Sequence, residues 1–141
     1  MDYRRFEDTV ILRVDPGEEI FEQLTRVADE MQIELAQVDG LGALKELNVG
    51  VYNAATKDYH SNLLTGAYEI VSLMGTITRM EGKSYLHIHL SAADMSGHMV
   101  GGHLNRAVVS ATAELVIRLI DGKAGRKKSE KVGLNLLDFD S

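Results

Sequence analysis

The sequence predicts an α+β fold in which one main helix covers a largely antiparallel sheet. Two observations lead to this prediction. Residues 20–31 repeat apolar side chains at helical spacing, whereas most of the remaining chain consists of short, strand-like apolar or alternating runs. Short turn sequences such as Glu81-Gly82-Lys83 join neighbouring runs, which is typical of antiparallel strands. A chain of 141 residues has the length of one domain, so we expect residues 1–141 to form one domain.

The amino-terminal part is expected to form a strand followed by the main helix. Residues 8–14 alternate apolar and polar side chains and predict the first strand. Asp15 is the expected helix cap and Pro16 the expected first helical residue, since these residue types are favoured at those positions. The helix is expected to run to about Gln32, with its apolar face formed by Ile20, Leu24, Val27, Ala28 and Met31.

The rest of the chain is expected to form strands separated by turns. The predicted strands cover residues 33–38, 43–52, 67–80, 84–92, 98–105, 106–120 and 130–138. A turn is expected at residues 39–42, where two glycines occur. Residues 106–120 are apolar on both faces of the predicted strand, which indicates burial on both faces. Because so small a domain has few places to bury two faces, this strand favours a subunit interface.

Two histidines on one predicted strand are the main functional signal. His87 and His89 are two residues apart, and residues two apart on a strand point to the same face. The opposite face of that strand is apolar and consists of Leu86, Ile88 and Leu90. One face therefore packs on the core, while the other presents two imidazoles, an arrangement that favours a metal site or a proton-handling site.

A third histidine is expected to join this pair. A hairpin turning at residues 95–96 would place His89 opposite residue 102 or His103, and opposed Cβ atoms lie about 4.5–5.5 Å apart. His98 would lie roughly 13 Å from His89 along the ladder, so it is excluded from the site. His60 cannot be placed from the sequence. Two alternatives stay open: a bulge could shift the pairing, or the histidines could have a purely structural role.

Composition limits the chemistry of such a site and its partners. The chain has no cysteine, so a metal would be held by imidazole, carboxylate or water. A net charge of −6 argues against a generic nucleic-acid-binding protein, and the one basic run, Arg126-Lys127-Lys128, is expected to be a solvated hairpin loop. No apolar run is long enough to span a membrane, and the first residues do not form a signal peptide. We therefore expect a cytoplasmic protein.

Other potential catalytic groups are weaker candidates. Ser91, His87 and Asp94 are the residue types of a hydrolase triad, but no nucleophile-elbow motif surrounds the serine. Glu69 and Glu114 lie in strands that are otherwise apolar. Either carboxylate could be a surface group or could orient a histidine ligand from behind.

Several sequence blocks, taken in order, resemble the plants-and-prokaryotes-conserved (PPC) domain, also called DUF296. These blocks are residues 15–18, 38–44, 68–75, 87–94 and 101–103, and together they extend over nearly the whole chain. The most specific are His-Ile-His-Leu-Ser-Ala-Ala-Asp and Gly-Gly-His, which contain the three histidines.

The resemblance implies an α+β fold with one helix covering the sheet, and a homotrimer. It also implies a metal site, with zinc as the expected ion, formed by His87, His89 and His103. Plant members of the family join the domain to AT-hook segments and act as nuclear DNA-binding proteins. This chain has no Arg-Gly-Arg-Pro, and its one proline is Pro16, so it resembles stand-alone prokaryotic members without an AT-hook.

The leading hypothesis is a trimeric, metal-binding PPC-domain protein whose biochemical activity and small-molecule ligand stay open. A first alternative is a zinc-dependent hydrolase or lyase, because three histidines leave the fourth zinc position open to water. Glu69 is the candidate base for that reaction. A second alternative is a DNA-binding regulatory protein, by kinship to the plant proteins, although we expect no sequence-specific DNA binding.

Overall fold

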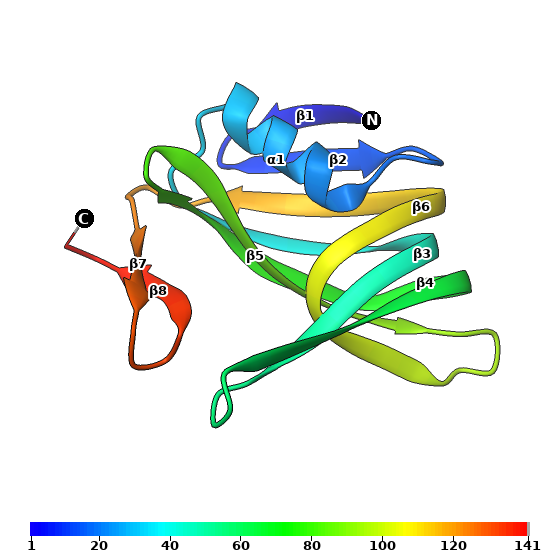
Figure 1. Cartoon of the computed structure of the whole chain (residues 1–141). Helices are drawn as coiled ribbons and strands as arrows, with labels where there is room; N and C mark the ends of the chain where they lie inside the picture. The colour runs from blue at the N-terminus through cyan, green and yellow to red at the C-terminus, as the bar shows by residue number, and fades with distance from the viewer. Residues whose placement is uncertain (141) are drawn as a thin grey trace.

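The computed structural model describes residues 1–140 and shows one helix and eight strands among them (Figure 1). The elements are β1 (Asp2–Phe6), β2 (Thr9–Val14), α1 (Ile20–Glu30), β3 (Ala36–Asn53), β4 (Asp58–Met80), β5 (Lys83–Ala93), β6 (Met99–Leu119), β7 (Gly125–Ser129) and β8 (Leu134–Asp138). Six strands form one antiparallel sheet in the order β1-β2-β6-β3-β4-β5. The long, bent strand β6 also pairs with β5, so β3, β4, β5 and β6 form a closed circuit of paired strands.

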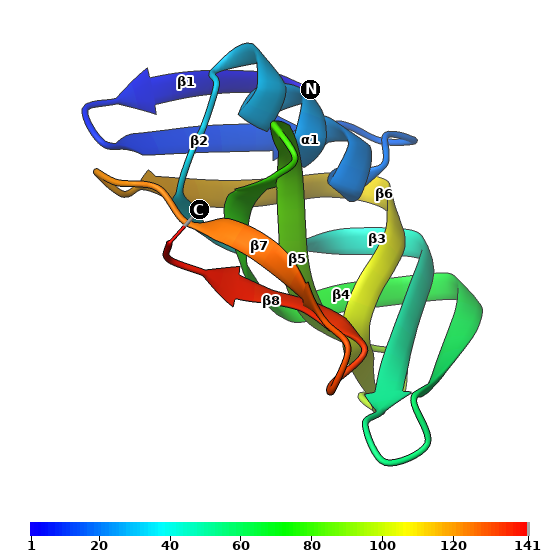
Figure 2. The ribbon, with the colours of Figure 1, turned by 60° about the vertical axis from the view of Figure 1, so that its left-hand side comes forward.

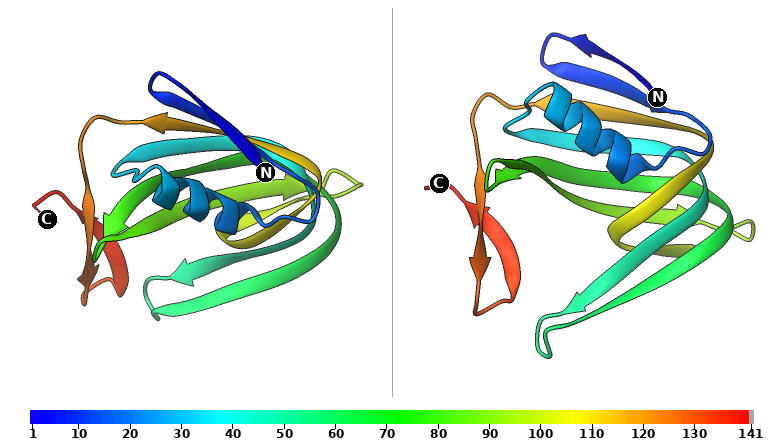
Figure 3. Two further views of the ribbon diagram at one scale, coloured as in Figure 1. Left: turned by 90° about the horizontal axis from the view of Figure 1, so that it is seen from above. Right: turned by 45° about the horizontal axis from the view of Figure 1, so that its top comes forward.

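The sheet carries its helix on one face, as the sequence predicts. α1 packs against β5 and β6 (Figure 3). Its residues Ile20, Leu24, Val27 and Ala28 are fully buried. Leu86, Ile88 and Leu90 of β5 contribute to the same core, so the predicted apolar face of this strand is confirmed. The histidines of β5 consequently lie on the face of the sheet that points away from α1.

The predicted start of the helix is wrong. The helical residues begin at Ile20, and the cap is Glu19, whose carboxylate accepts hydrogen bonds from the backbone N–H groups of Phe21 and Glu22. Asp15 instead forms ion pairs with the amino terminus and with Arg13. The helix also ends at Glu30, slightly earlier than predicted. The Asp-Pro pattern could not reveal this, because a buried glutamate four residues later supplies the same acceptor.

Two predicted pairs of strands are each one continuous strand. Residues 33–38 and 43–52 were expected to flank a turn, but residues 36–53 form β3 without interruption. Gly42 is required inside this strand, because a Cβ atom there would lie 2.6 Å from the Cα atom of Ala113 on β6. The glycines therefore mark a close approach of two strands rather than a turn. Similarly, the predicted strands 98–105 and 106–120 are both parts of β6.

Strand β6 is not buried on both faces within one chain. Residues such as Ala113, Leu115 and Ile117 are buried, whereas Glu114 and Val116 between them are exposed. Ala107, Val108 and Val109 are buried in succession, but the expectation of double burial is wrong for residues 110–120 of the single chain, because only one layer, containing α1, covers that part of the sheet. The long apolar run is instead a strand with one buried face and one exposed, partly apolar face.

The carboxyl-terminal segment forms a separate two-stranded hairpin of β7 and β8. Figure 2 shows this hairpin lying across β5, and β7 packs against β4. The predicted last strand, residues 130–138, begins later, at Leu134. The basic run was expected to be a solvated loop, but Arg126 lies on β7 and is half-buried against the sheet. Strand β1, which pairs with β2, was not predicted.

Candidate metal centre

The fold brings together the three histidines that the sequence singled out. His87 and His89 lie on β5, and His89 pairs directly with His103 on β6. This register is one of the two that hairpin geometry predicted, so the glycines at 101 and 102 do not shift it away. The same three side chains are the group among residues 1–140 whose ligand atoms lie close enough together to hold a metal ion.

The distances within the cluster fit a shared metal ion. The Nε2 atoms of His87 and His89 are 3.3 Å apart. Two nitrogen ligands of a tetrahedral zinc ion, each about 2.0–2.1 Å from it, lie about 3.4 Å apart. A ligand atom of His103 lies within 4.8 Å of the ligand atoms of the other two, so all three side chains are near enough to share one ion. Neutral imidazole nitrogens are suitable ligands for zinc and related transition metals.

A polar network holds Tyr59, whose ring contacts the third histidine. The ring of Tyr59 meets the ring of His103 edge to face, with centroids 6.1 Å apart. The Tyr59 hydroxyl is hydrogen-bonded to the side chain of Asn105, 2.7–3.0 Å away, and Asn105 in turn donates to the Oδ1 atom of Asn48. These contacts restrain the ring of His103, and such surrounding groups often control how well a site holds its metal.

On the other side of the cluster, Arg126 lies close to His87. Its guanidinium group lies over the ring of Tyr85, 4.7 Å from the centroid, and donates to the hydroxyl of Thr76 at 3.3 Å. Thr76 is the residue of β4 that pairs with His87, and Tyr85 precedes His87 by two residues on the same face of β5. The hairpin therefore places a positive charge beside the metal-binding face.

The surroundings of His87 and His103 favour the neutral form that binds metal. Burial lowers the pKa of His87, and the nearby His89, Arg126 and His103 lower it further. Burial also lowers the pKa of His103, with an additional contribution from His89. Since an ordinary histidine has a pKa of about 6.5, a lowered pKa favours the neutral form of both rings at pH 7. Their nitrogens are therefore free of the extra proton that competes with a metal.

These lowered pKa values predict how pH affects the metal-free protein. The folded pKa of each ring lies below the unfolded value of about 6.5, so the unfolded chain binds more protons between those two values. The stability from the neutral rings is complete above about pH 6.5 and is lost as the pH falls toward the folded pKa. We expect the melting temperature to fall between pH 7.5 and 5.5, and to fall less in a His87→Gln/His103→Gln variant. Equal decreases in the two proteins would contradict the prediction.

The other proposed site residues do not join the cluster. His98 is exposed and lies near Asp94, 3.7 Å away, as its exclusion predicted. Asp94 accepts hydrogen bonds from the backbone N–H groups of Ser96 and His98, so it forms no triad with Ser91. His60, which the sequence could not place, lies on β4 opposite Val51, and it is exposed.

Glu69 and Glu114 are not partners of the histidines, so their proposed orienting role is wrong. Glu69 pairs with Ala93, five positions along β4 from Met74, the residue opposite His89. At about 3.3 Å per residue, that separation is roughly 16 Å. Glu114 lies on the part of β6 that pairs with β2.

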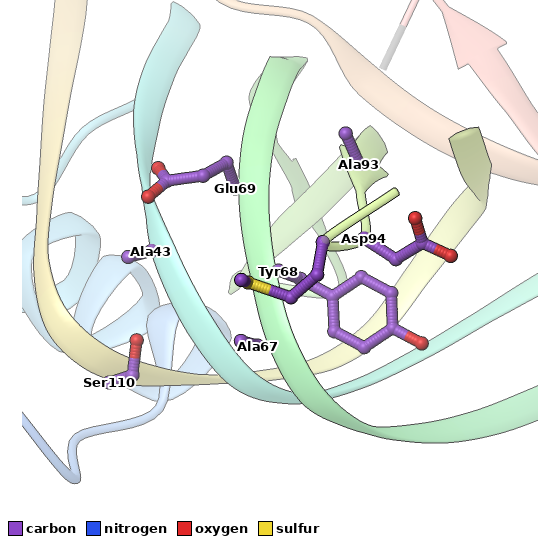
Figure 4. A pocket seen from close by; sticks show the side chains of 8 residues that line it. Ala43, Ala67, Tyr68, Glu69, Ala93, Asp94 and Ser110 are labelled. Carbon is purple, nitrogen blue, oxygen red and sulfur yellow. The ribbon is translucent and has the colours of Figure 1, made fainter. Parts of the chain in front are cut away.

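Two hollows lie on the surface near these residues. One, of about 120 Å³, is lined by Glu69, Asp94 and Tyr68. Figure 4 shows the carboxylates of Glu69 and Asp94 pointing away from each other, so this hollow does not form an acidic site. The other has a volume of about 240 Å³ and is lined by His89, together with residues such as Ser91 and Met74. Space for a small molecule therefore exists directly beside the histidine cluster.

The structure also adds residues that sequence reasoning missed. Tyr59, Asn105 and Arg126 contact the cluster or its immediate neighbours, yet they come from distant parts of the chain. Only the basic run was noticed in the sequence, and it was assigned to a loop. No sequence spacing indicates these contacts, because they depend on how β4, β6 and β7 cross.

The fold and the cluster define a class of protein: a small antiparallel sheet with one covering helix and a three-histidine candidate metal centre. A family model of the Plants and Prokaryotes Conserved (PCC) domain matches residues 1–121, and the chain belongs to this family. The resemblance that the sequence blocks suggested is therefore confirmed.

Solved structures of other proteins share this fold along the whole chain. A candidate DNA-binding protein from Bacteroides thetaiotaomicron is 27% identical, with a TM-score of 0.96 over 99% of this chain and 98% of that one. A metal-containing protein from Archaeoglobus fulgidus is 29% identical, with a TM-score of 0.84 over 96% of this chain and 95% of that one. These similarities establish the antiparallel, one-helix architecture.

Curated relatives match this chain over part of their length. The bifunctional protein GlmU of Synechococcus sp. (strain JA-3-3Ab) is 31% identical over 108 residues, which are 75% of this chain and 16% of that protein. The chain thus spans about a sixth of the length of the curated relatives it matches.

Within residues 1–140, α1 is too short to cross a membrane.

Proposed function

We propose that this PCC-domain protein binds a zinc ion through His87, His89 and His103. The observation that carries the proposal is the 3.3 Å separation of the Nε2 atoms of His87 and His89, which is close to the spacing of about 3.4 Å between two ligands on one zinc ion. The metal-containing relative from Archaeoglobus fulgidus supports the same conclusion. Elemental analysis of the purified protein tests it, with about one zinc ion per chain as the expected result. If the purified protein contains no metal and takes up none when it is incubated with zinc, the proposal is overturned.

The proposed site is of the open kind. Three protein ligands leave the fourth position of a tetrahedral ion for water or another small ligand, as in catalytic rather than purely structural zinc sites. Bound zinc would lower the pKa of such a water to about 7 and thereby supply a nucleophile. No carboxylate joins the histidine cluster within residues 1–140, so a hydrolase or lyase reaction would have to do without Glu69 as its base. We therefore place metal binding first and the enzymatic alternative second.

We also propose that the protein forms a homotrimer. Apolar side chains are exposed on the face of the sheet opposite α1. Among them are Leu41 of β3 and Val71 of β4, which are 55% and 58% exposed. Both lie next to register shifts of their strands. Val116 of β6 and its partner Ile11 of β2 extend this apolar surface. A second copy of the chain could bury it. Light scattering at micromolar concentration is expected to give three times the mass of one chain. A monomer would rule out the interface, and a dimer would rule out the threefold symmetry.

We expect no sequence-specific binding to DNA, although two structural neighbours are candidate DNA-binding proteins. In the basic run, Arg126 is half-buried against the sheet rather than on an open surface that a DNA duplex could contact, and Lys128 pairs with Glu130 at 3.3 Å. With a net charge of −6, little exposed positive surface is left for a DNA backbone. Specific complexes typically have a Kd of about 10⁻⁸–10⁻¹¹ M. A sequence-dependent, nanomolar mobility shift at ~150 mM salt, lost in Lys127→Ala/Lys128→Ala, would contradict this expectation.

A further inference from the structure

The half-buried Arg126 is held in place by neutral groups. Its Nε atom donates to the hydroxyl of Thr78 at 3.0 Å, Nη2 donates to the hydroxyl of Thr76 at 3.3 Å, and Nη1 donates to the backbone carbonyl of Asn135 at 3.1 Å. The ring of Tyr85 covers one face of the guanidinium plane. The side chain is therefore fixed in position, as a binding group needs to be.

The positive charge of Arg126 has no counter-charge in the part of the chain that the structure describes. The salt bridges among residues 1–140 do not include it. A partly desolvated guanidinium without an anion is unfavourable, and neutral side chains could make the same three hydrogen bonds at a lower desolvation cost. A guanidinium group has five N–H donors, so its three hydrogen bonds leave two donors available. The guanidinium can therefore accept an anionic partner from a ligand.

The position of this charge connects it with the histidine cluster. Thr76 and Tyr85, which hold the guanidinium, are the cross-strand partner and the same-face neighbour of His87. A dication bound by the histidines would add more positive charge to the same face. The hollow of about 240 Å³ is lined by His89 and does not include Arg126, which lies beside His87. Two cationic groups on one face of the sheet favour a ligand with negative charge.

We propose that Arg126 binds the anionic group of a small oxyanion ligand, a carboxylate or a phosphate, that occupies the open position of the metal centre. The planar guanidinium donates paired hydrogen bonds to the oxygen atoms of such groups, whereas a lysine would act only as a point charge. The inference rests on the proposed zinc site and names the ligand class of that site. The residue comes from the hairpin beyond residue 121, so it lies outside the segment that the family model matches.

The test uses the full chain loaded with Co²⁺, whose visible absorption reports a change of ligand at the open position. Acetate and inorganic phosphate are titrated into the wild type, Arg126→Gln, Arg126→Lys and, as a matched control on the same strand, Lys127→Gln. Acetamide, the neutral counterpart of acetate, is titrated into the wild type. The melting temperature and cobalt content of every variant are measured first.

We expect acetate and phosphate, but not acetamide, to bind the wild type, and Arg126→Gln to raise the Kd of both anions about tenfold or more. Lys127→Gln should leave the Kd unchanged, and Arg126→Lys should lie between the wild type and Arg126→Gln. Equal anion affinity in the wild type and Arg126→Gln would overturn the inference while leaving the metal site intact. The inference would also be overturned if acetamide bound the wild type as tightly as acetate. Loss of cobalt from Arg126→Gln would overturn it too, since the arginine would then support the fold or the metal. If the wild type takes up no metal, the proposed function fails, and this inference with it.

Discussion

Replacing either His87 or His103 by alanine is expected to abolish stoichiometric zinc binding. Each variant leaves two imidazoles for a site built from three, and no carboxylate in the described chain lies in the cluster to replace the lost ligand. Loss of a group that merely orients a ligand weakens metal binding about 10- to 100-fold, so loss of a ligand itself should weaken it further. Elemental analysis and competition with a chromophoric chelator measure the effect.

Two other histidines provide matched controls for this experiment. His98→Ala removes an exposed imidazole from the loop beside Asp94, and His60→Ala removes one from β4. Both variants should keep the zinc content and affinity of the wild type. Because the three clustered histidines lie at the surface rather than in the core, the alanine variants should fold, which circular dichroism would verify. Full zinc content in both His87→Ala and His103→Ala would show that the site assignment is wrong.

The largest loss of stability among single polar substitutions is expected at Glu19. Its carboxylate is buried, caps α1 through the N–H groups of Phe21 and Glu22, and accepts from the N–H of Ala107 on β6 at 2.7 Å. Alanine at this position removes the cap, which costs about 0.5–2 kcal/mol. It also leaves a buried N–H group without a partner, which costs about 1–3 kcal/mol. We expect the free energy of unfolding to fall by about 2–4 kcal/mol in Glu19→Ala.

Urea unfolding of three variants separates this role from a general effect of charge. Glu22→Ala removes an exposed carboxylate from the first turn of the same helix and should change the free energy of unfolding by less than about 1 kcal/mol. Asp15→Ala removes the residue that the sequence favoured as the cap, but that carboxylate is partly exposed and pairs with Arg13 and the amino terminus. A larger loss in Asp15→Ala than in Glu19→Ala would contradict the assignment of the cap.

The two predictions differ in how far the sequence alone could support them. The histidine cluster follows from strand periodicity and from a hairpin that pairs neighbouring segments, and the observed pairing of His89 with His103 is one of the two expected. The cap at Glu19 could not be predicted, because its carboxylate also accepts a hydrogen bond from the N–H of Ala107, which lies 88 residues away in the chain. Local patterns therefore favoured Asp15 as the cap, but in the fold Asp15 forms ion pairs with Arg13 and the amino terminus.

The same limit explains the strands that were divided wrongly. Glycines at positions 40 and 42 resemble a turn when only their neighbours in sequence are considered. In the fold, β3 crosses β6 so closely there that a side chain at Gly42 would collide with the backbone of Ala113. Similarly, the apolar run on β6 indicated two buried faces, because the sequence does not show which face a second layer covers.

The sequence by itself determined the antiparallel, one-helix architecture, the family, and the three histidines that form the candidate metal centre. The architecture and the histidine cluster depend on periodicity and on pairing across a short hairpin, and the family follows from the resemblance of short sequence blocks, so all three are encoded locally. The tertiary structure alone decided what surrounds the centre: Tyr59 beside His103, Arg126 beside His87, and Glu69 far from both. These positions depend on how strands distant in sequence cross and on where the hairpin of β7 and β8 folds back. Each contact is favourable only once the whole sheet has formed, and no short segment of the chain specifies it.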